Sequence, residues 1–207
     1  MRLWRLEISG GALVVAAILF YMDRDGVMPW LLLACALHEC GHWWAIRTLG
    51  GRVQSGRISC IGAELKLSSA HPLSPERMVL AALAGPAMNL LLATGSWYLA
   101  RHGLGVRLYL FAGLNLGLAG FNLLPAGQLD GGRALVAFLR WTGREELAEK
   151  AVRFSSLLAS LLLFFAGALL LEQSEGRNFT VFLVGLWMLG TLFRRSREEK
   201  SEKRQKK

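Results

Sequence analysis

Long apolar stretches alternate with short polar links along most of this chain. Six apolar segments can be distinguished: Ile8–Met22, Val27–Ile46, Met78–Ala100, Leu108–Leu129, Phe154–Leu171 and Asn178–Phe193. A helix needs roughly 20 residues to span a bilayer, so the first and last segments are short for that task. The pattern predicts an all-α polytopic membrane protein with about six transmembrane helices. We expect one integral-membrane domain at residues 1–193, with its core at 28–133, and a basic tail at 194–207.

One connecting region has a different periodicity. Apolar and polar residues alternate from Ile61 to Ser68, so that Ile61, Ala63, Leu65 and Leu67 share one face. Period two is typical of a strand. Together with Val53–Ser59, it predicts a small membrane-associated β-hairpin or sheet between the second and third apolar segments. This element is either a structured connector or an edge strand to which an extended substrate adds, bound by the four residues of that face.

The basic residues are distributed unevenly between the two sides of the predicted membrane. The net charge is +9, and 20 of the 24 lysines and arginines fall on one side if six spans start from an inside N-terminus. Only Arg24, Arg101, Arg107 and Arg177 fall on the other side. This is the positive-inside pattern, and it predicts cytosolic termini and a lipid bilayer, not nucleic acid, as the partner. No small-x-small cleavage site follows Phe20, so we expect the first span to be retained.

The second apolar segment carries a group of ionisable residues, His38-Glu39-Cys40-Gly41-His42, which reads HExxH. On a helix, positions i and i+4 share a face, so His38 and His42 can bind one metal ion. Glu39 lies beside them, where it can activate a water as general base. Ionisable residues are costly within a bilayer and therefore indicate function. The motif predicts a catalytic zinc ion.

A zinc enzyme needs a third protein ligand, and Asp130 is the best candidate. It is the only carboxylate between Glu76 and Glu145, and it falls at the cytosolic end of the fourth segment, at a depth like that of the HExxH. The alternative is that Asp130 pairs with Arg133, three residues on. His71 and His102 are expected at the surface. Asn89, in the third segment, is expected to form a hydrogen bond to another helix in a packing role.

Two motifs together resemble the site-2 protease family of intramembrane zinc metalloproteases, peptidase family M50. They are His38–His42 and Asn122-x-x-Pro125-x-x-x-x-Asp130-Gly131, and the stretch Ala84-Gly85-Pro86-x-x-Asn89 is also similar to that family. The resemblance covers about residues 31–133. The six-span layout is similar to the branch that includes the sporulation protease of endospore-forming bacteria.

The resemblance implies regulated intramembrane proteolysis in a bacterial cytoplasmic membrane, with the active site near the cytosolic side. His38, His42 and Asp130 would hold Zn²⁺, Glu39 would be the general base, and Asn122 would stabilise the substrate or the developing oxyanion. The substrate would be a transmembrane or membrane-associated protein, such as a sporulation sigma-factor precursor, and a membrane partner would gate or inhibit the site. Two other functions use the same residues: a catalytically inactive membrane adaptor and a metal transporter.

Overall fold

The computed structural model describes residues 5–59, 62–68, 72–173, 179 and 181–192. The chain divides into two compact units, Met1–Leu123 and Leu124–Lys207, and each is described by itself. The sequence predicted a single domain over residues 1–193. Whether the two units form one domain stays a prediction.

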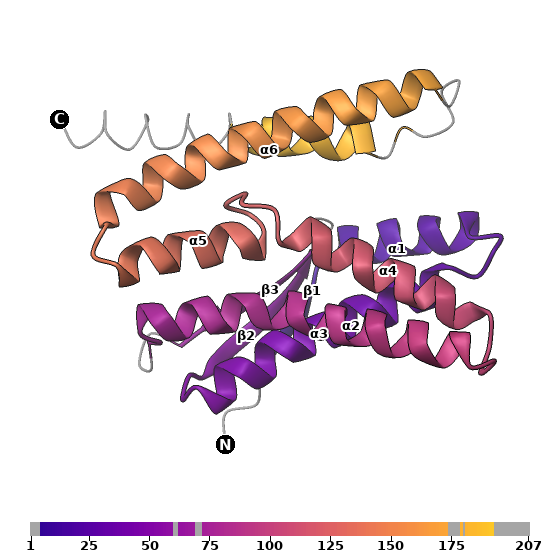
Figure 1. Ribbon diagram of the computed structural model, residues 1–207, viewed down its shortest axis with the longest axis horizontal. Coiled ribbons are helices and arrows are strands. Elements are labelled where there is room, and N and C mark those ends of the chain that lie inside the picture. The colour runs from indigo at the N-terminus through magenta and orange to yellow at the C-terminus, as the bar shows by residue number, and fades with distance from the viewer. Residues whose placement is uncertain (1–4, 60–61, 69–71, 174–178, 180, 193–207) are drawn as a thin grey trace. The chain divides into compact units, whose positions relative to one another are not determined.

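Four helices make up most of the first unit (Figure 1): α1 (Gly10–Met22), α2 (Met28–Thr48), α3 (Pro75–Arg101) and α4 (Arg107–Asn122). Both α2 and α4 pack against α3, which is therefore the central helix of this unit. The buried residues of α2 recur at helical spacing, as Ala34, His38, Gly41, His42 and Ile46. The face that α2 turns to its neighbours is thus the face that carries both motif histidines.

Local capping fixes both ends of α2. The carboxylate of Asp23 accepts hydrogen bonds from the backbone N–H groups of Val27 and Met28, each at 2.9 Å. These amides belong to the first turn, where no carbonyl of the helix itself can serve them. At the other end Gly50 has φ +87°, and the N–H of Gly51 bonds to the carbonyl of Ile46 at 2.8 Å. Glycine is favoured there because a left-handed residue ends the helix.

The predicted hairpin is present and belongs to a three-stranded sheet. Strand β2 (Val53–Ser59) pairs antiparallel with β3 (Gly62–Leu67), which confirms the strand prediction for this region. Strand β1 (Arg5–Ile8), which the sequence analysis did not predict, pairs parallel with β2 and gives the order β1-β2-β3. Four residues ahead of an apolar run carry no strand signal, because their pairing partner lies about fifty residues further on.

One apolar cluster joins this sheet to the helices. Its buried centre consists of Ile46 near the end of α2, Leu73 ahead of α3, and Ala81 within α3. Val53 and Leu67 of the sheet pack against it. Burial of apolar surface stabilises the folded state by roughly 25 cal/mol for each Å² removed from water. The cluster therefore attaches the hairpin to the same two helices that carry the metal-binding motif and its neighbours.

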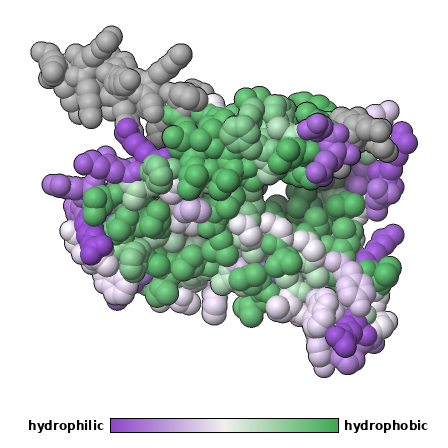
Figure 2. Space-filling model, turned by 45° about the horizontal axis from the view of Figure 1, so that its top comes forward, coloured by the Kyte–Doolittle hydropathy of each residue, from purple (hydrophilic) through white to green (hydrophobic). Residues whose placement is uncertain are grey.

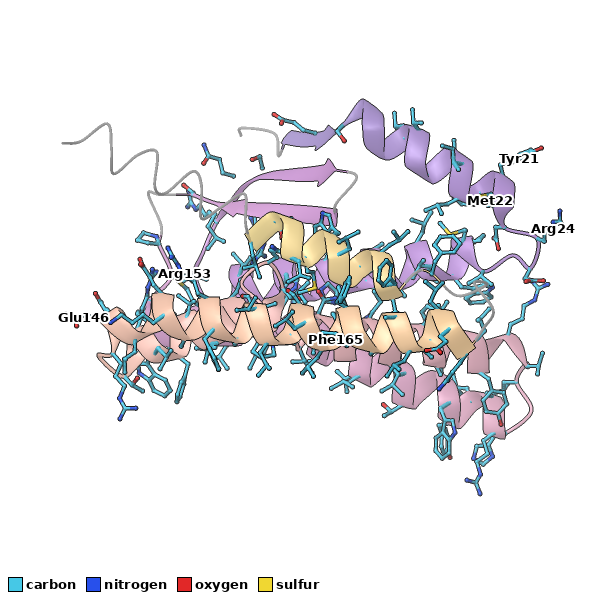
Figure 3. The ribbon with its side chains drawn as sticks, turned by 90° about the horizontal axis from the view of Figure 1, so that it is seen from above. Tyr21, Met22, Arg24, Glu146, Arg153 and Phe165 are labelled. Atoms are coloured by element: carbon cyan, nitrogen blue, oxygen red, sulfur yellow. The ribbon has the colours of Figure 1, made fainter. Side chains whose placement is uncertain are left out.

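The second unit contains α5 (Asp130–Trp141), α6 (Glu145–Gln173) and a shorter helix, Val181–Leu192. The stretch between the fourth and fifth predicted apolar segments is itself helical: α5 covers its first part, and α6 begins at Glu145 and continues without a break into the fifth apolar segment. Figure 3 shows Glu146 and Arg153 in the N-terminal part of α6 and Phe165 further along it.

Two of the described helices, α3 and α6, are long and apolar enough to cross a membrane. Their surfaces support that role. Leu80 and Leu91 of α3 and Leu162 and Phe165 of α6 are more than half exposed, and apolar residues cover much of the face seen in Figure 2. Soluble proteins rarely leave such extended apolar surface in water. The protein is therefore a mostly helical membrane protein.

Candidate metal centre

The two motif histidines converge on α2. His38 and His42 are one turn apart and buried, and their Nε2 atoms lie 3.1 Å from each other. Two nitrogen ligands of a tetrahedral zinc, each about 2.0–2.1 Å from the metal, lie about 3.3 Å apart. The separation of the two nitrogens therefore fits two ligands of one zinc ion.

Hydrogen bonds on the other ring nitrogens fix the tautomer of both histidines. Nδ1 of His42 lies 2.8 Å from the carbonyl oxygen of Ala81, which can only accept, so Nδ1 carries the proton. Nδ1 of His38 bonds to Oδ1 of Asn89 and is likewise the donor. A neutral imidazole that is protonated on Nδ1 presents a lone pair on Nε2. Both rings are thus held in the form that binds a metal through Nε2.

Helix α3 approaches this pair through a glycine. A Cβ placed on Gly85 would stand 2.2 Å from Nε2 of His42 and 2.7 Å from Nε2 of His38, far inside van der Waals contact. A second close approach is at Gly41 of α2, where a Cβ would meet the carbonyl oxygen of Ala84 at 2.8 Å. Small residues let two helices approach closely. At Gly85 the lack of a side chain also leaves room directly beside the histidine nitrogens.

Glu39 follows His38 on α2. It is half-buried, and it is the only acidic residue of that helix. Because successive helical residues are rotated by about 100°, Glu39 flanks the histidine face without lying on it. This is the placement expected of a base beside a metal site.

In the second unit, Asp130 is the first residue of α5 and is buried, as the two histidines are in the first unit. A helix N-terminus stabilises a negative charge. Oδ1 of Asp130 lies 3.9 Å from Nη1 of Arg133, whose side chain is half exposed, so the alternative sequence interpretation, an ion pair, is present but long. Exposed pairs of this kind contribute little, which makes Arg133 a weak reason for burying a carboxylate.

The loop ahead of Asp130 is held by α6. The hydroxyl of Ser155 donates to the carbonyl of Pro125 at 2.5 Å, and the hydroxyl of Ser156 accepts from the N–H of Gly127 at 2.9 Å. A Cβ on Gly132 would stand 2.1 Å from the carbonyl oxygen of Ala126, so the loop folds directly over the first turn of α5. The absence of a side chain at Gly132 therefore lets the loop pack against the start of α5.

The remaining predicted site residues have the following positions. Asn122 is the last residue of α4, and its side-chain N–H donates to the carbonyl of Leu118 at 3.1 Å, within its own helix. Ala63, Leu65 and Leu67 belong to β3, one of the two edge strands of the described sheet. Leu67 packs against the apolar cluster. Ile61 lies outside the described residues. Their roles in catalysis and substrate binding stay predictions.

Two residues of this centre escaped the sequence analysis. Gly85 was named only within the stretch that is similar to the site-2 protease family. Asn115 of α4 was not singled out, although it is fully buried and bonds to Asn89. The signal that could have found Asn115 is its chemistry, since an amide in an otherwise apolar helix needs a partner. Asn89, expected to form an interhelical bond in a packing role, bonds directly to His38.

Parts of this chain are similar to known proteins. Residues 97–167 match the family model described as peptidase family M50. Rip3 of Mycobacterium tuberculosis, which carries the name of a zinc metalloprotease, is 32% identical over 137 residues, covering 59% of this chain and 33% of Rip3. A zinc metalloprotease of Methanocaldococcus jannaschii is 29% identical over 142 residues, covering 65% of this chain and 41% of the relative.

The fold has a solved counterpart. The site-2 protease from Methanocaldococcus jannaschii superposes with a TM-score of 0.65 at 23% identity, covering 94% of each chain. The mostly helical fold with a small sheet is therefore that of a site-2 protease. The family-model match and the two named zinc metalloproteases make the chain similar to peptidase family M50, the family that its two motifs resemble. It spans about a third to two fifths of the length of the curated relatives named above.

Proposed function

We propose that this protein is an intramembrane zinc metalloprotease that hydrolyses peptide bonds of membrane-embedded or membrane-associated proteins. The observation that carries the proposal is the convergence of the Nε2 atoms of His38 and His42, each with its Nδ1 proton held by a buried acceptor. Such support is typical of histidines that bind a metal. The similarity to peptidase family M50 and to a named zinc metalloprotease supports zinc as the metal and proteolysis as the reaction.

Asp130 is the proposed third ligand. It is a carboxylate, a ligand type that zinc accepts beside two histidines, and it is buried like both of them. Among the residues whose burial the structure describes, it is the only buried carboxylate. Three protein ligands leave a fourth position for water, as catalytic zinc sites require. The donor set therefore fits a catalytic zinc ion.

The chain's own residues divide the chemistry between them. Bound zinc would supply a Lewis acid and lower the pKa of a coordinated water. Glu39 would accept a proton from the attacking water and later return it to the leaving amine. Asn122 is the proposed donor to the substrate carbonyl, for which its amide would release the bond that it now makes to Leu118.

The edge strand β3 is the proposed binding element for the substrate. Transmembrane substrates are helical, and a helix hides its peptide bonds, so the cleaved stretch must unwind before it can react. An extended stretch can add to the free edge of a sheet through backbone hydrogen bonds. Strand β3 is at the edge of the order β1-β2-β3, and Leu67 at its end is fixed on the cluster that joins α2 and α3.

The proposed topology has six spans, cytosolic termini and the site near the cytosolic side of a bacterial cytoplasmic membrane. It is supported by the excess of basic residues on the predicted inner segments. We further propose a membrane partner that gates or inhibits the enzyme, because unregulated proteolysis within the membrane would damage other proteins. Membrane-bound precursors of transcription factors are the proposed substrate class.

The experiment compares membrane proteomes of the native host expressing wild-type or Glu39→Gln protein. We expect an uncut membrane protein to accumulate in the variant, because the base is lost while the ligands remain. The purified variant should retain its zinc and lose cleavage of that protein by roughly 10²- to 10⁴-fold, the contribution of a general base. Cleavage at the wild-type rate by Glu39→Gln would rule out this mechanism.

A further inference from the structure

A line of buried hydrogen bonds crosses the first unit from α4 through α3 to α2. The side-chain N–H of Asn115 donates to the carbonyl of Phe111 at 2.8 Å, and its Oδ1 accepts from Nδ2 of Asn89 at 2.7 Å. Oδ1 of Asn89 in turn accepts from Nδ1 of His38. Both asparagines are fully buried. Three helices are thus connected by a single polar path that ends on a motif histidine.

The direction of every bond in this path is fixed from its far end. The carbonyl of Phe111 can only accept, so the amide nitrogen of Asn115 faces it and the oxygen of Asn115 faces Asn89. Nδ2 of Asn89 therefore points to Asn115, and it also lies 3.4 Å from the carbonyl of Ala34. The oxygen of Asn89 is left for His38, whose Nδ1 must donate. If Asn115 were absent, the amide of Asn89 would lose its stronger partner, and only the long bond to the carbonyl of Ala34 would constrain its orientation.

The two histidines are supported in different ways. His42 donates to the backbone carbonyl of Ala81, which is present whatever side chains the neighbours carry. His38 depends on a side-chain amide that is itself held by a second side-chain amide. Substitutions in the path should therefore disturb one ligand and leave the other unchanged. If the two asparagines served only to pack the helices together, the bond between them would be sufficient. The further bond from Asn89 to His38 would then have no purpose.

We propose that Asn115 is a positioning residue for the metal centre, which acts through Asn89 to hold His38 in the tautomer and orientation that bind a metal through Nε2. The inference rests on the proposed metal site and extends it to a residue of α4 that neither motif contains. Partners of this kind, which orient a ligand without touching the metal, typically change metal affinity by 10- to 100-fold.

The test measures zinc affinity of the purified full-length protein in detergent, by competition with a chelator. We expect Asn115→Leu, which removes both hydrogen bonds at nearly constant volume, to weaken zinc binding by about 10-fold or more. Asn89→Leu should weaken it at least as much. Because the two residues act in series, the double variant should bind zinc no more weakly than Asn89→Leu alone. Additive losses would contradict the path.

Two further variants separate positioning from stability. Phe111→Leu reduces the contact of a buried α4 ring with Trp30 of α2 but keeps the backbone carbonyl that Asn115 uses. It should lower the unfolding temperature and leave zinc affinity unchanged. Asn115→Asp keeps an oxygen that can accept from Asn89, so its affinity should lie closer to the wild type than to Asn115→Leu, and it serves where the leucine variant does not fold.

The outcomes also separate this inference from the proposed function. Wild-type protein that binds no zinc would remove the metal centre and the inference together. Wild-type protein that binds zinc, with unchanged affinity in both Asn115 variants, would leave the proposed function intact and overturn the inference alone. The absorption spectrum of the cobalt-substituted protein gives a second readout. A changed spectrum in Asn115→Leu, but not in Phe111→Leu, is expected if His38 is displaced.

Discussion

Gly85 of α3 faces Nε2 of His42 so closely that a single added carbon would stand 2.2 Å from this nitrogen. The same carbon would lie 2.7 Å from Nε2 of His38. The absence of a side chain at Gly85 therefore keeps the space beside both Nε2 atoms open. A methyl group at this position would occupy the space between the two imidazoles and the backbone of α3.

We expect Gly85→Ala to abolish zinc binding. The methyl group must push both rings away from their present positions. The two Nε2 lone pairs then no longer converge on one metal ion. The measurement is the zinc content per chain after dialysis. Gly95→Ala, two to three turns along the same helix, has nothing within 4 Å of the added carbon. It should keep its zinc and gain roughly 0.5–1 kcal/mol of stability, the usual effect of alanine in a helix interior. Full zinc content in Gly85→Ala would disprove the proposed geometry.

We expect Asp130→Ala to lose zinc while Arg133→Gln keeps it. If Asp130 is a ligand, its removal should reduce zinc affinity by more than the roughly 10- to 100-fold that an outer partner costs. If its role is the long ion pair with Arg133, the two variants should behave alike. Zinc titration of both proteins distinguishes the two roles. Equal and small effects on zinc would exclude Asp130 from the ligand set.

Acid should weaken the start of α2 through Asp23. The N–H groups of Met28 and Val27 bond to this carboxylate and hold its pKa below the ordinary value. A lowered pKa in the folded state means that the stabilisation is present above the unfolded pKa of about 4 and is lost as pH falls through the folded pKa. The wild type should therefore lose thermal stability below about pH 4 more steeply than Asp23→Asn.

The matched control for Asp23 is its neighbour on the same loop. Asp25→Asn removes one carboxylate without removing the acceptor of the Val27 and Met28 amides. Its unfolding temperature should follow the wild-type dependence on pH. Identical pH profiles for wild type and Asp23→Asn would show that these two hydrogen bonds do not stabilise the helix start.

The second unit has its own close helix contact, which we expect to be sensitive to single methyl groups. A Cβ on Gly167 of α6 would meet the backbone N of Phe182 at 2.3 Å, and one on Gly185 would meet the backbone N of Phe164 at 2.5 Å. Gly167→Ala or Gly185→Ala should destabilise this unit by about 1–3 kcal/mol, as overpacking does. Gly190→Ala, where nothing lies within 4 Å, should not. Thermal unfolding in detergent compares the three.

The HExxH, its helix and the neighbouring hairpin could all be predicted from the sequence, because each depends on local order along the chain. The spacing of His38 and His42 puts both on one face of any helix. The alternation of apolar and polar residues up to Leu67 predicts a strand without any knowledge of the tertiary structure. Asp130 could be named as a candidate ligand from the sequence for a related reason, since a lone carboxylate in apolar surroundings indicates a function.

What the tertiary structure alone decided are the relationships between segments far apart in the sequence. Strand β1 acquires its conformation from β2, about fifty residues later. Asn89 could be expected to bond to another helix, but only the packing of α2, α3 and α4 shows that it joins Asn115 to His38. Gly85 matters because of two rings on a different helix. The sequence by itself determined which residues can bind a metal, since that follows from side-chain chemistry and helical period. The packing of helices determined which residues hold the ligands in place, because such contacts depend on where the whole chain comes to lie.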